Sequence, residues 1–413
     1  MISKLIRLNS LGLIVLSVAP KLTLHLKNAS VAFVAFLLAL AIWLPCLHFL
    51  FLRPVSDFYR TTGISPKARA LAARHLHLWT DPSSREAELR KMRSSNAEWD
   101  FMGRSFFVWS LANMGLREPQ FKDQYLRVMD QIISETLKIE RQDGIYAFLM
   151  PYAKARPYVV KPARSLFIDG EVALMMGARR MLQENPAYRQ PMTDRLNVIE
   201  SRWRASPIMA AESYPDECWT FDHAVALAAL KVADRLDGTD HSELCKQWIE
   251  IARAKLVDKR TGLLVSSYET DGTPLDGPEG STIWMVAHCL RVVDATFARD
   301  QYQRARKELG RVLLGFGYGT EWPVSWQGPR DIDSGMVIPG LEVSAGSSGM
   351  AFMAASSFQD WKFLQALNTT LDMAAFPSRR DGQLKYCASN QVGDAALLYA
   401  SVLGPLWART AKQ

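Results

Sequence analysis

Residues 31–52 form an uncharged run, VAFVAFLLALAIWLPCLHFLFL, that contains no Asp, Glu, Lys or Arg. A helix of about 20 apolar residues is long enough to cross the hydrocarbon core of a bilayer. A buried helix of a soluble protein rarely stays uncharged over this length. The run therefore predicts one transmembrane helix, in which Pro45 would introduce at most a kink.

A shorter apolar stretch, residues 11–20, precedes this span. It resembles the core of a signal peptide, but no small-residue cleavage site follows it before the longer span. We interpret it as an interfacial segment or a marginal second span, so residues 1–55 are expected to form a membrane anchor. Basic residues before and after the span are balanced, so the positive-inside rule does not decide orientation. Our working expectation is an inner-membrane protein whose domain lies outside the cytoplasm.

Charge and cysteine usage exclude several classes of partner. The chain carries 49 basic and 42 acidic residues, and much of the excess lies near the span. This location favours contact with the lipid bilayer over nucleic acid, since no basic stripe alternates with aromatic residues. The five cysteines show no Cys-x-x-Cys spacing, which argues against a metal site. No phosphate loop or dinucleotide fingerprint is present, so no cofactor is predicted. A homo-oligomer remains open.

From about residue 56 onward, apolar residues recur at helical spacing. Amphipathic segments, such as residues 242–255, alternate with segments that are apolar on all sides, such as residues 224–233 and 346–356. A helix that is apolar all round is buried all round. We therefore predict an all-α fold, an (α/α)6-like toroid, that forms a single domain over residues 56–413. The candidate helices span residues 66–77, 85–115, 119–140, 165–184, 190–204, 219–236, 241–255, 279–296, 300–315, 342–356, 358–374 and 390–408.

Long loops rich in Gly, Pro, Asp and aromatic residues precede the apolar helices. In a toroid these loops meet at one mouth of the barrel, where sites are commonly built. The run GFGYG at residues 315–319 resembles a glycine-rich loop, but we predict no strand before it and discount that reading. The long loops cover residues 141–165, 205–219, 262–280, 315–341 and 375–390.

Carboxylates beside the starts of these inner helices are the candidate catalytic groups. A carboxylate near a helix start is also a normal N-cap, so capping is the alternative for each of them. Asp222 precedes a buried run, and a carboxylate in an apolar cavity has a raised pKa and can donate a proton. We expect Asp222 to be the less solvated general acid and Glu171 to stay ionised. The catalytic set is Asp222, Glu171, Asp333 and Asp169. The residues expected to bind a small-molecule substrate are Tyr214, Glu217, Trp219, Glu279, Tyr318, Trp322 and Arg330.

A stretch from Pro215 to Tyr268 resembles the linalool dehydratase–isomerase family. It begins with Pro215-Asp216, continues through a helix that ends DRLDGTD at residues 234–240, and a looser match covers residues 95–405. The resemblance implies an α/α barrel with a cofactor-free acid–base site for a small terpene alcohol. Two family cysteines fall on Ser213 and Asp222, and a family histidine falls on Glu171.

Three functions are consistent with these patterns. The first is a membrane-anchored hydro-lyase or isomerase that acts on an apolar alcohol or isoprenoid-like substrate. The second is a glycosidase-like toroid enzyme, because paired carboxylates amid Trp and Tyr suit sugar rings. The third is a non-catalytic membrane scaffold, which would be favoured if the carboxylates were salt-bridged caps.

Overall fold

The computed structural model describes residues 8–332 and 334–411 and divides the chain into two compact units, residues 1–51 and 52–413. The first unit consists of helix α1 (Leu8–Cys46) and a 3₁₀ turn, η1 (Leu47–Leu50). Within it, Lys27–Leu50 has a mean hydropathy of 2.4 and is the one segment of the described chain that is helical, long and apolar enough to cross a membrane.

Residues 11–20 were expected to form a short apolar segment ahead of the span. These residues belong to α1, which continues without a turn to Cys46. Lys21 and Lys27 interrupt the apolar composition, but helical hydrogen bonding joins backbone groups and does not require apolar side chains. The chain leaves the α-helical path one residue after Pro45, where the sequence predicted a kink.

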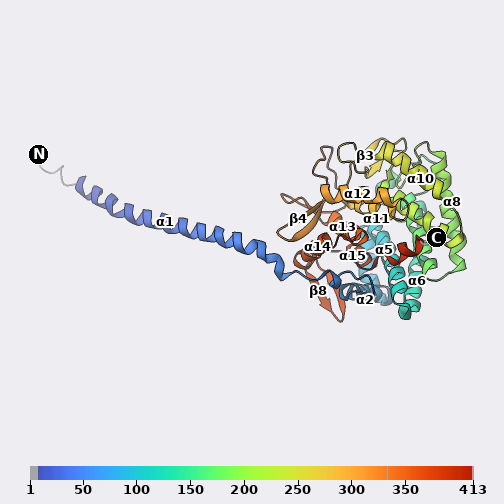
Figure 1. The fold of residues 1–413 in the computed structure, drawn as a ribbon, viewed down its shortest axis with the longest axis horizontal. Helices are drawn as coiled ribbons and strands as arrows, with labels where there is room; N and C mark the ends of the chain where they lie inside the picture. The colour runs from blue at the N-terminus through green and yellow to red at the C-terminus, as the bar shows by residue number, and fades with distance from the viewer. Residues whose placement is uncertain (1–7, 333, 412–413) are drawn as a thin grey trace. The chain divides into compact units, whose positions relative to one another are not determined.

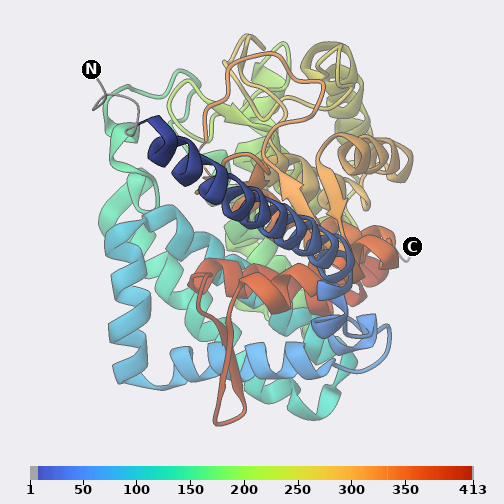
Figure 2. The same cartoon turned by 90° about the vertical axis from the view of Figure 1, so that its left-hand side faces the viewer.

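The second unit is an α/α toroid, which confirms the predicted fold class (Figure 1). Among its described residues, each inner helix packs on the next, and the last packs on the first, so the ring is closed. Figure 2 shows the same helices after a turn of 90°. The inner helices are α5 (Ala97–Arg117), α7 (Leu166–Leu182), α9 (Thr220–Asp237), α11 (Gly280–Leu290), α13 (Ala345–Phe358) and α15 (Gln391–Val402).

Outer helices alternate with the inner ones along the chain. They are α2 (Pro66–Thr80), α6 (Lys122–Asp143), α8 (Arg189–Ala205), α10 (Ser242–Ile251), α12 (Ala295–Glu308) and α14 (Trp361–Ala374), while α3 (Pro82–Arg85), α4 (Lys91–Ser95) and α16 (Pro405–Thr410) are short. Because each outer helix returns the chain, the inner helices run in one direction. Their N-termini therefore lie at the same end of the barrel.

Small residues allow the inner helices to pack closely. A Cβ atom added to Gly170 of α7 would lie 3.3 Å from the Cβ atom of Ala226 of α9. Every residue of α7 is buried, and so are the first eleven residues of α9. This all-round burial agrees with the apolar composition that identified both helices as inner ones.

In the described residues, short antiparallel strands are confined to the loops that precede inner helices. The first sheet comprises β1 (Cys218–Trp219), β2 (Ser267–Tyr268) and β3 (Pro274–Asp276). The second has the order β4 (Gly310–Leu313), β5 (Phe316–Thr320), β7 (Val343–Ser344) and β6 (Val337–Ile338). The third pairs β8 (Pro377–Arg380) with β9 (Gln383–Tyr386).

The helix expected over residues 300–315 is shorter than predicted. Helix α12 ends at Glu308, and β4 then pairs with β5, so GFGYG is largely a hairpin strand and a strand does precede it. The connecting residues Leu314 and Gly315 have φ values of 49° and 84°, which a helix cannot contain. Apolar periodicity alone could not reveal this reversal, because residues 309–314 are apolar enough to continue either element.

Candidate active site

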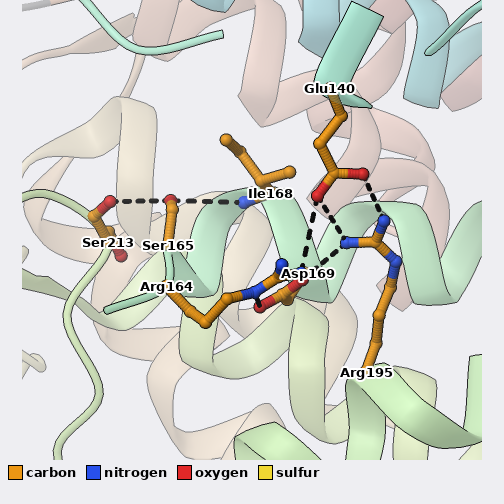
Figure 3. A network of polar contacts seen from close by, with 7 residues as sticks. All are labelled: Glu140, Arg164, Ser165, Ile168, Asp169, Arg195 and Ser213. Atoms are coloured by element: carbon orange, nitrogen blue, oxygen red, sulfur yellow. Dashed lines mark hydrogen bonds and ion pairs between the residues drawn. The ribbon is translucent and has the colours of Figure 1, made fainter. Parts of the chain in front are cut away.

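Two buried carboxylates tie together the loops at the N-terminal end of the barrel. The Glu212 carboxylate accepts hydrogen bonds from the backbone N–H groups of Val159, Val160 and Asp216, each at 2.8 Å. It therefore joins the loop before α7 to the loop before α9. The Ser165 hydroxyl, which caps α7, donates to the carbonyl of Ser213 at 2.7 Å and adds a second link (Figure 3).

Glu321 has the same function between α11 and α13. Its carboxylate accepts from the backbone and hydroxyl of Ser281 and from the hydroxyls of Ser334 and Ser344. Its carbonyl accepts from the N–H of Gly280 at 2.7 Å. These bonds fix the starts of α11 and α13. The carboxylates of Glu212 and Glu321 are both occupied by such bonds, so neither is available for catalysis.

Glu171 lies in the second turn of α7 and is completely buried. Burial, opposed by the Ser105 hydroxyl, raises the pKa of this carboxyl well above its usual range, and the charges of Asp222 and Glu98 raise it further. Both carboxylate oxygens lack a hydrogen-bond partner of ordinary geometry among the described residues. Glu171 is therefore held neutral, because an ionised form would be neither solvated nor paired.

Asp222 lies in the first turn of α9, and 6% of its surface is exposed to solvent. Burial raises its pKa to about 8, with the Ser213 hydroxyl opposing the shift and Glu98 adding to it. Its side chain does not cap the helix, because the N-cap residue of α9 is Trp219 and no side-chain cap bond forms there. A carboxyl that is protonated at neutral pH can act as a general acid.

The expected division of roles between these two carboxyls differs from the structure in one respect. Glu171, which we expected to stay ionised, is completely buried, and burial raises the pKa of its carboxyl well above the usual range. The sequence did not indicate which carboxyl is the more buried. Glu171 lies about one turn further into its helix than Asp222 does, and the apolar pattern does not show how deeply each turn is covered. Among the described residues, neither Glu171 nor Asp222 takes part in a salt bridge, whereas Asp169 pairs with Arg164 and Arg195.

Glu98 is the carboxylate that sequence reasoning missed. It lies in the first turn of α5, is half-buried, and acts electrostatically on both Glu171 and Asp222. It also hydrogen-bonds to the Tyr214 hydroxyl, which contributes to the raised pKa of that phenol. Asn96 could have indicated this helix start from the sequence. It is the N-cap residue of α5 and lies eleven residues after the start of the helix we predicted.

Aromatic rings stack above this cluster. Tyr152, which is 55% exposed, stacks on the buried Tyr214 with ring centroids 4.8 Å apart and an interplanar angle of 13°. The Met150 N–H donates to the Tyr214 hydroxyl at 3.0 Å, and the Tyr152 hydroxyl donates to Glu217 at 3.4 Å. Tyr214 and Glu217 flank a tight turn, in which Asp216 has a φ of 62°. Tyr152, stacked on Tyr214, therefore presents a flat aromatic face to solvent.

Asp169, predicted to be catalytic, instead belongs to an ion-pair network (Figure 3). Its carboxylate accepts from Arg164 Nε at 2.9 Å and from Arg195 Nη1 at 2.5 Å, and both arginines also contact Glu140. Two residues in a helix are about 200° apart, so Asp169 and Glu171 face opposite sides of α7. We therefore leave Asp169 out of the catalytic set.

The remaining predicted residues are dispersed. Asp333 lies outside the described residues. Trp322 is buried and stacks on Trp326 at 6.0 Å, and its segment is tied to the end of α12 rather than to Tyr214 or Trp219. Half-buried Trp219 is the N-cap residue of α9, and buried Glu279 holds that position on α11. Tyr318 lies on β5, and Arg330 is exposed and pairs with Glu342 at 3.8 Å.

Hollows elsewhere on the barrel do not contain this cluster. One of about 410 Å³ lies between α9, α10 and the start of α12, and one of about 600 Å³ lies between α8 and α10. Both are on the outer helices and lack the three carboxyls. In the part of the chain that the structure describes, no three His, Cys, Asp or Glu side chains are arranged to hold a metal ion.

Comparison with solved structures finds several that are similar to this chain. UGL with dGlcA-Glc-Rha-Glc is 13% identical, covers 81% of this chain and 94% of its own, and has a TM-score of 0.50. An α-1,6-mannanase from Salegentibacter sp. HEL1_6 is 13% identical over 74% of this chain and 89% of its own, with a TM-score of 0.47. A family 105 glycoside hydrolase from C. acetobutylicum ATCC 824 is 13% identical over 83% and 99%, with a TM-score of 0.45. No model of a protein family matches the sequence.

These findings correct the resemblance to linalool dehydratase–isomerase. The structural neighbours are α/α-toroid glycoside hydrolases, so neither the family assignment nor the expected dehydration of an apolar alcohol stands. The stretch from Pro215 to Tyr268 covers the inner helix α9, the outer helix α10 and the loops beside them, so its order of helix and loop is that of the toroid. The carboxyls at Glu171 and Asp222, where the resembled family has an imidazole and a thiol, agree with this correction.

Proposed function

We propose that this protein is an enzyme that hydrolyses glycosidic bonds in a saccharide. The observation that carries the proposal is the cluster of Glu98, Glu171 and Asp222 at the starts of three consecutive inner helices. Glycoside hydrolysis requires two carboxyl groups in different protonation states. The fold shared with UGL, whose structure contains dGlcA-Glc-Rha-Glc, supports a carbohydrate substrate.

In the proposed reaction Asp222 is the general acid. Its raised pKa keeps it protonated at neutral pH, and it donates that proton to the glycosidic oxygen as the C–O bond breaks. Glu98, which is half-buried, takes a proton from the water molecule that attacks the anomeric carbon. The products are a free hemiacetal and the alcohol of the leaving sugar, so atoms and charge balance. Glu171 is too buried to contact substrate and serves as a neutral positioning residue beside Asp222.

The stacked tyrosines supply a surface for a sugar ring. The faces of pyranose rings carry C–H groups that pack well on aromatic faces, and Tyr152 exposes such a face. Glu217, beside the Tyr152 hydroxyl, is placed to accept hydrogen bonds from sugar hydroxyls.

We also propose that α1 anchors the enzyme in a membrane and that residues 56–413 work as its single catalytic domain. The apolar composition of Lys27–Leu50 and its side chains, none of which is buried in protein, support the anchor. The bilayer is then a partner of the chain. Homo-oligomerisation and the orientation outside the cytoplasm remain proposals.

The experiment that tests the function is a screen of the full chain in detergent. A panel of uronic-acid-containing oligosaccharides and α-linked mannans is incubated with the wild type and with Asp222→Asn, and released reducing ends are measured. We expect release from at least one saccharide by the wild type and its loss in the variant. Equal release by both proteins would contradict the assigned role, and failure to release or bind any saccharide would contradict the substrate class.

A further inference from the structure

The hairpin β4–β5 has an apolar tip that is exposed to solvent. Val312, Leu313 and Leu314 expose 49%, 46% and 44% of their surfaces. Successive strand residues point to opposite faces, so consecutive apolar residues leave neither face of the tip polar. A hairpin on the surface of a soluble protein normally has one polar face. This tip is therefore better suited to an apolar medium than to water.

The turn at the tip places a leucine where the backbone disfavours one. Leu313 pairs with Phe316, so Leu314 and Gly315 form a two-residue turn, with φ values of 49° and 84°. Turns with positive φ at both central residues favour Asn-Gly, because Asn tolerates the left-handed region. The exposed Leu314 side chain gains too little from the core to offset this strain. An unfavourable residue at such a site points to a function outside the fold itself.

The β4–β5 hairpin packs on helix α14 beside the point where the chain enters the second unit. The carbonyl of Arg53 accepts a hydrogen bond from Gln365 Nε2 of α14 at 3.3 Å. Gly317 of β5 crosses the next residues of the same helix, since a Cβ atom there would lie 2.6 Å from the backbone nitrogen of Leu367. Figure 1 shows β4 on the side of this unit where the chain enters.

Only a short linker separates the candidate membrane span from this point. The candidate span ends at Leu50, and only three peptide steps separate it from Arg53. An extended chain advances at most ~3.6 Å per residue, so Arg53 lies within about 11 Å of the end of the span. If α1 crosses a bilayer, as proposed above, the part of the hairpin that packs on α14 is close to the lipid headgroups.

The hairpin β8–β9, which follows α14 in the chain, also carries exposed apolar and basic groups. Phe376, which follows the end of α14, is 67% exposed. Arg379 and Arg380 on β8 and Lys385 on β9 are also exposed. Apolar residues combined with Lys and Arg are typical of surfaces that bind anionic lipid at the headgroup level.

We propose that the tip of hairpin β4–β5 inserts into the headgroup region of an anionic bilayer, with β8–β9 as a second contact. This inference rests on the proposed anchor but not on the proposed reaction. Both hairpins precede inner helices, α13 and α15, at the mouth of the barrel. Docking therefore turns one side of the mouth toward the bilayer and favours saccharides presented at a membrane surface.

The test measures how deeply single labels lie in the membrane. Full-length protein in which Cys46 and Cys387 are replaced by Ala is given one cysteine, by Leu314→Cys, and labelled with a bimane fluorophore. It is reconstituted into phosphatidylcholine–phosphatidylglycerol vesicles that contain lipids with a nitroxide near the headgroup. The matched control is Leu341→Cys, which is 51% exposed in the β6–β7 turn. Because Val343 pairs with Thr320, that turn lies at the opposite end of the sheet from Leu314.

We expect the lipid nitroxide to quench the label at position 314 and to leave the label at position 341 unquenched. Equal quenching at the two positions in vesicle-bound protein would overturn hairpin docking while leaving the anchor intact. Failure of the chain to bind vesicles at all would overturn the anchor and this inference with it. Neither result bears on the hydrolysis of a soluble saccharide, so a failure of the proposed reaction can be distinguished from a failure of docking.

A second variant separates docking from a role in folding. Leu314→Asn suits the turn and should raise the Tm of the protein in detergent. In a chain that also carries Phe376→Ser, we expect weaker quenching of a label at Val312→Cys. A lower Tm together with unchanged quenching would show that Leu314 serves the fold, and the proposal would fail.

Discussion

At the residue scale, the state of a single proton on Asp222 governs the proposed chemistry. Two neighbouring inner helices place Asp222 and Glu171 in surroundings that favour the neutral carboxyl, while Glu98 stays near the mouth. The same burial that makes Asp222 a proton donor also costs stability when the proton leaves. Function and stability should therefore respond to the same pKa.

We predict that Asp222→Asn is more stable than the wild type at pH 8. The pKa of Asp222 is raised from 3.8 to about 8 by burial, so its contribution to stability is full below pH 3.8 and is lost as pH rises through 8. Asn has no proton to lose and removes this part of the pH dependence. Thermal unfolding of both proteins at pH 5 and pH 8 measures the effect. Identical pH slopes would contradict the raised pKa.

A second prediction concerns the exposed ring of Tyr152. Its replacement by Ala removes the stacking face, so we expect KM for the saccharide to rise by about tenfold, since losing the burial of a few sugar C–H groups costs roughly 1.4 kcal/mol. Tyr152→Phe keeps the face and loses only the hydroxyl that contacts Glu217. It should retain a KM near that of the wild type. Steady-state kinetics would contradict stacking if both variants lost affinity equally.

Which residues could be identified from the sequence depended on where they lie. Asp222 and Glu171 were found because each sits at the start of an obviously buried run. Glu98 was missed because the predicted helix began at residue 85, whereas a short π-helical turn and a break at Asn96 separate α5 from the preceding segment. The arginine partners that remove Asp169 from the site come from residues 164 and 195, and no local pattern indicates such pairing.

At the scale of elements, the site is held by contacts between loops and helix starts. The Glu212 and Glu321 carboxylates each satisfy groups from two loops. Such contacts join residues far apart in the sequence, which is why periodicity located the inner helices but not the short strands between them. The β4–β5 hairpin shows the same limit, since its reversal depends on two backbone torsions.

The start of α11 provides a test of this packing. A Cβ atom at Gly280 would lie 2.5 Å from the carbonyl oxygen of Thr320, so Gly280→Ala must move the backbone. We expect it to lower the free energy of unfolding by about 1–3 kcal/mol. Gly349 in α13 is the matched control, because nothing lies within 4 Å of its Cβ position. Gly349→Ala should raise stability by about 0.5–1 kcal/mol through helix propensity, as chemical denaturation can measure.

At the scale of the whole molecule, alternation of apolar and amphipathic helices was sufficient to predict the toroid. It was not sufficient to predict the chemistry, because every toroid places long loops at the starts of its inner helices. The resemblance to a dehydratase–isomerase followed that shared architecture. What distinguishes the present protein is the set of carboxyls at the mouth and the exposed tyrosine stack above them.

The central claim is that Asp222 acts as the protonated catalytic acid of a saccharide-hydrolysing site. The most direct test is the pH dependence of kcat/KM for the saccharide that the substrate screen identifies, measured for the wild type and for Asp222→Asn. The account predicts a wild-type profile that falls above pH about 8. It predicts a rate about 10²–10⁴-fold lower for Asp222→Asn, with no alkaline decline. A variant that retained the wild-type rate and the same alkaline decline would contradict it.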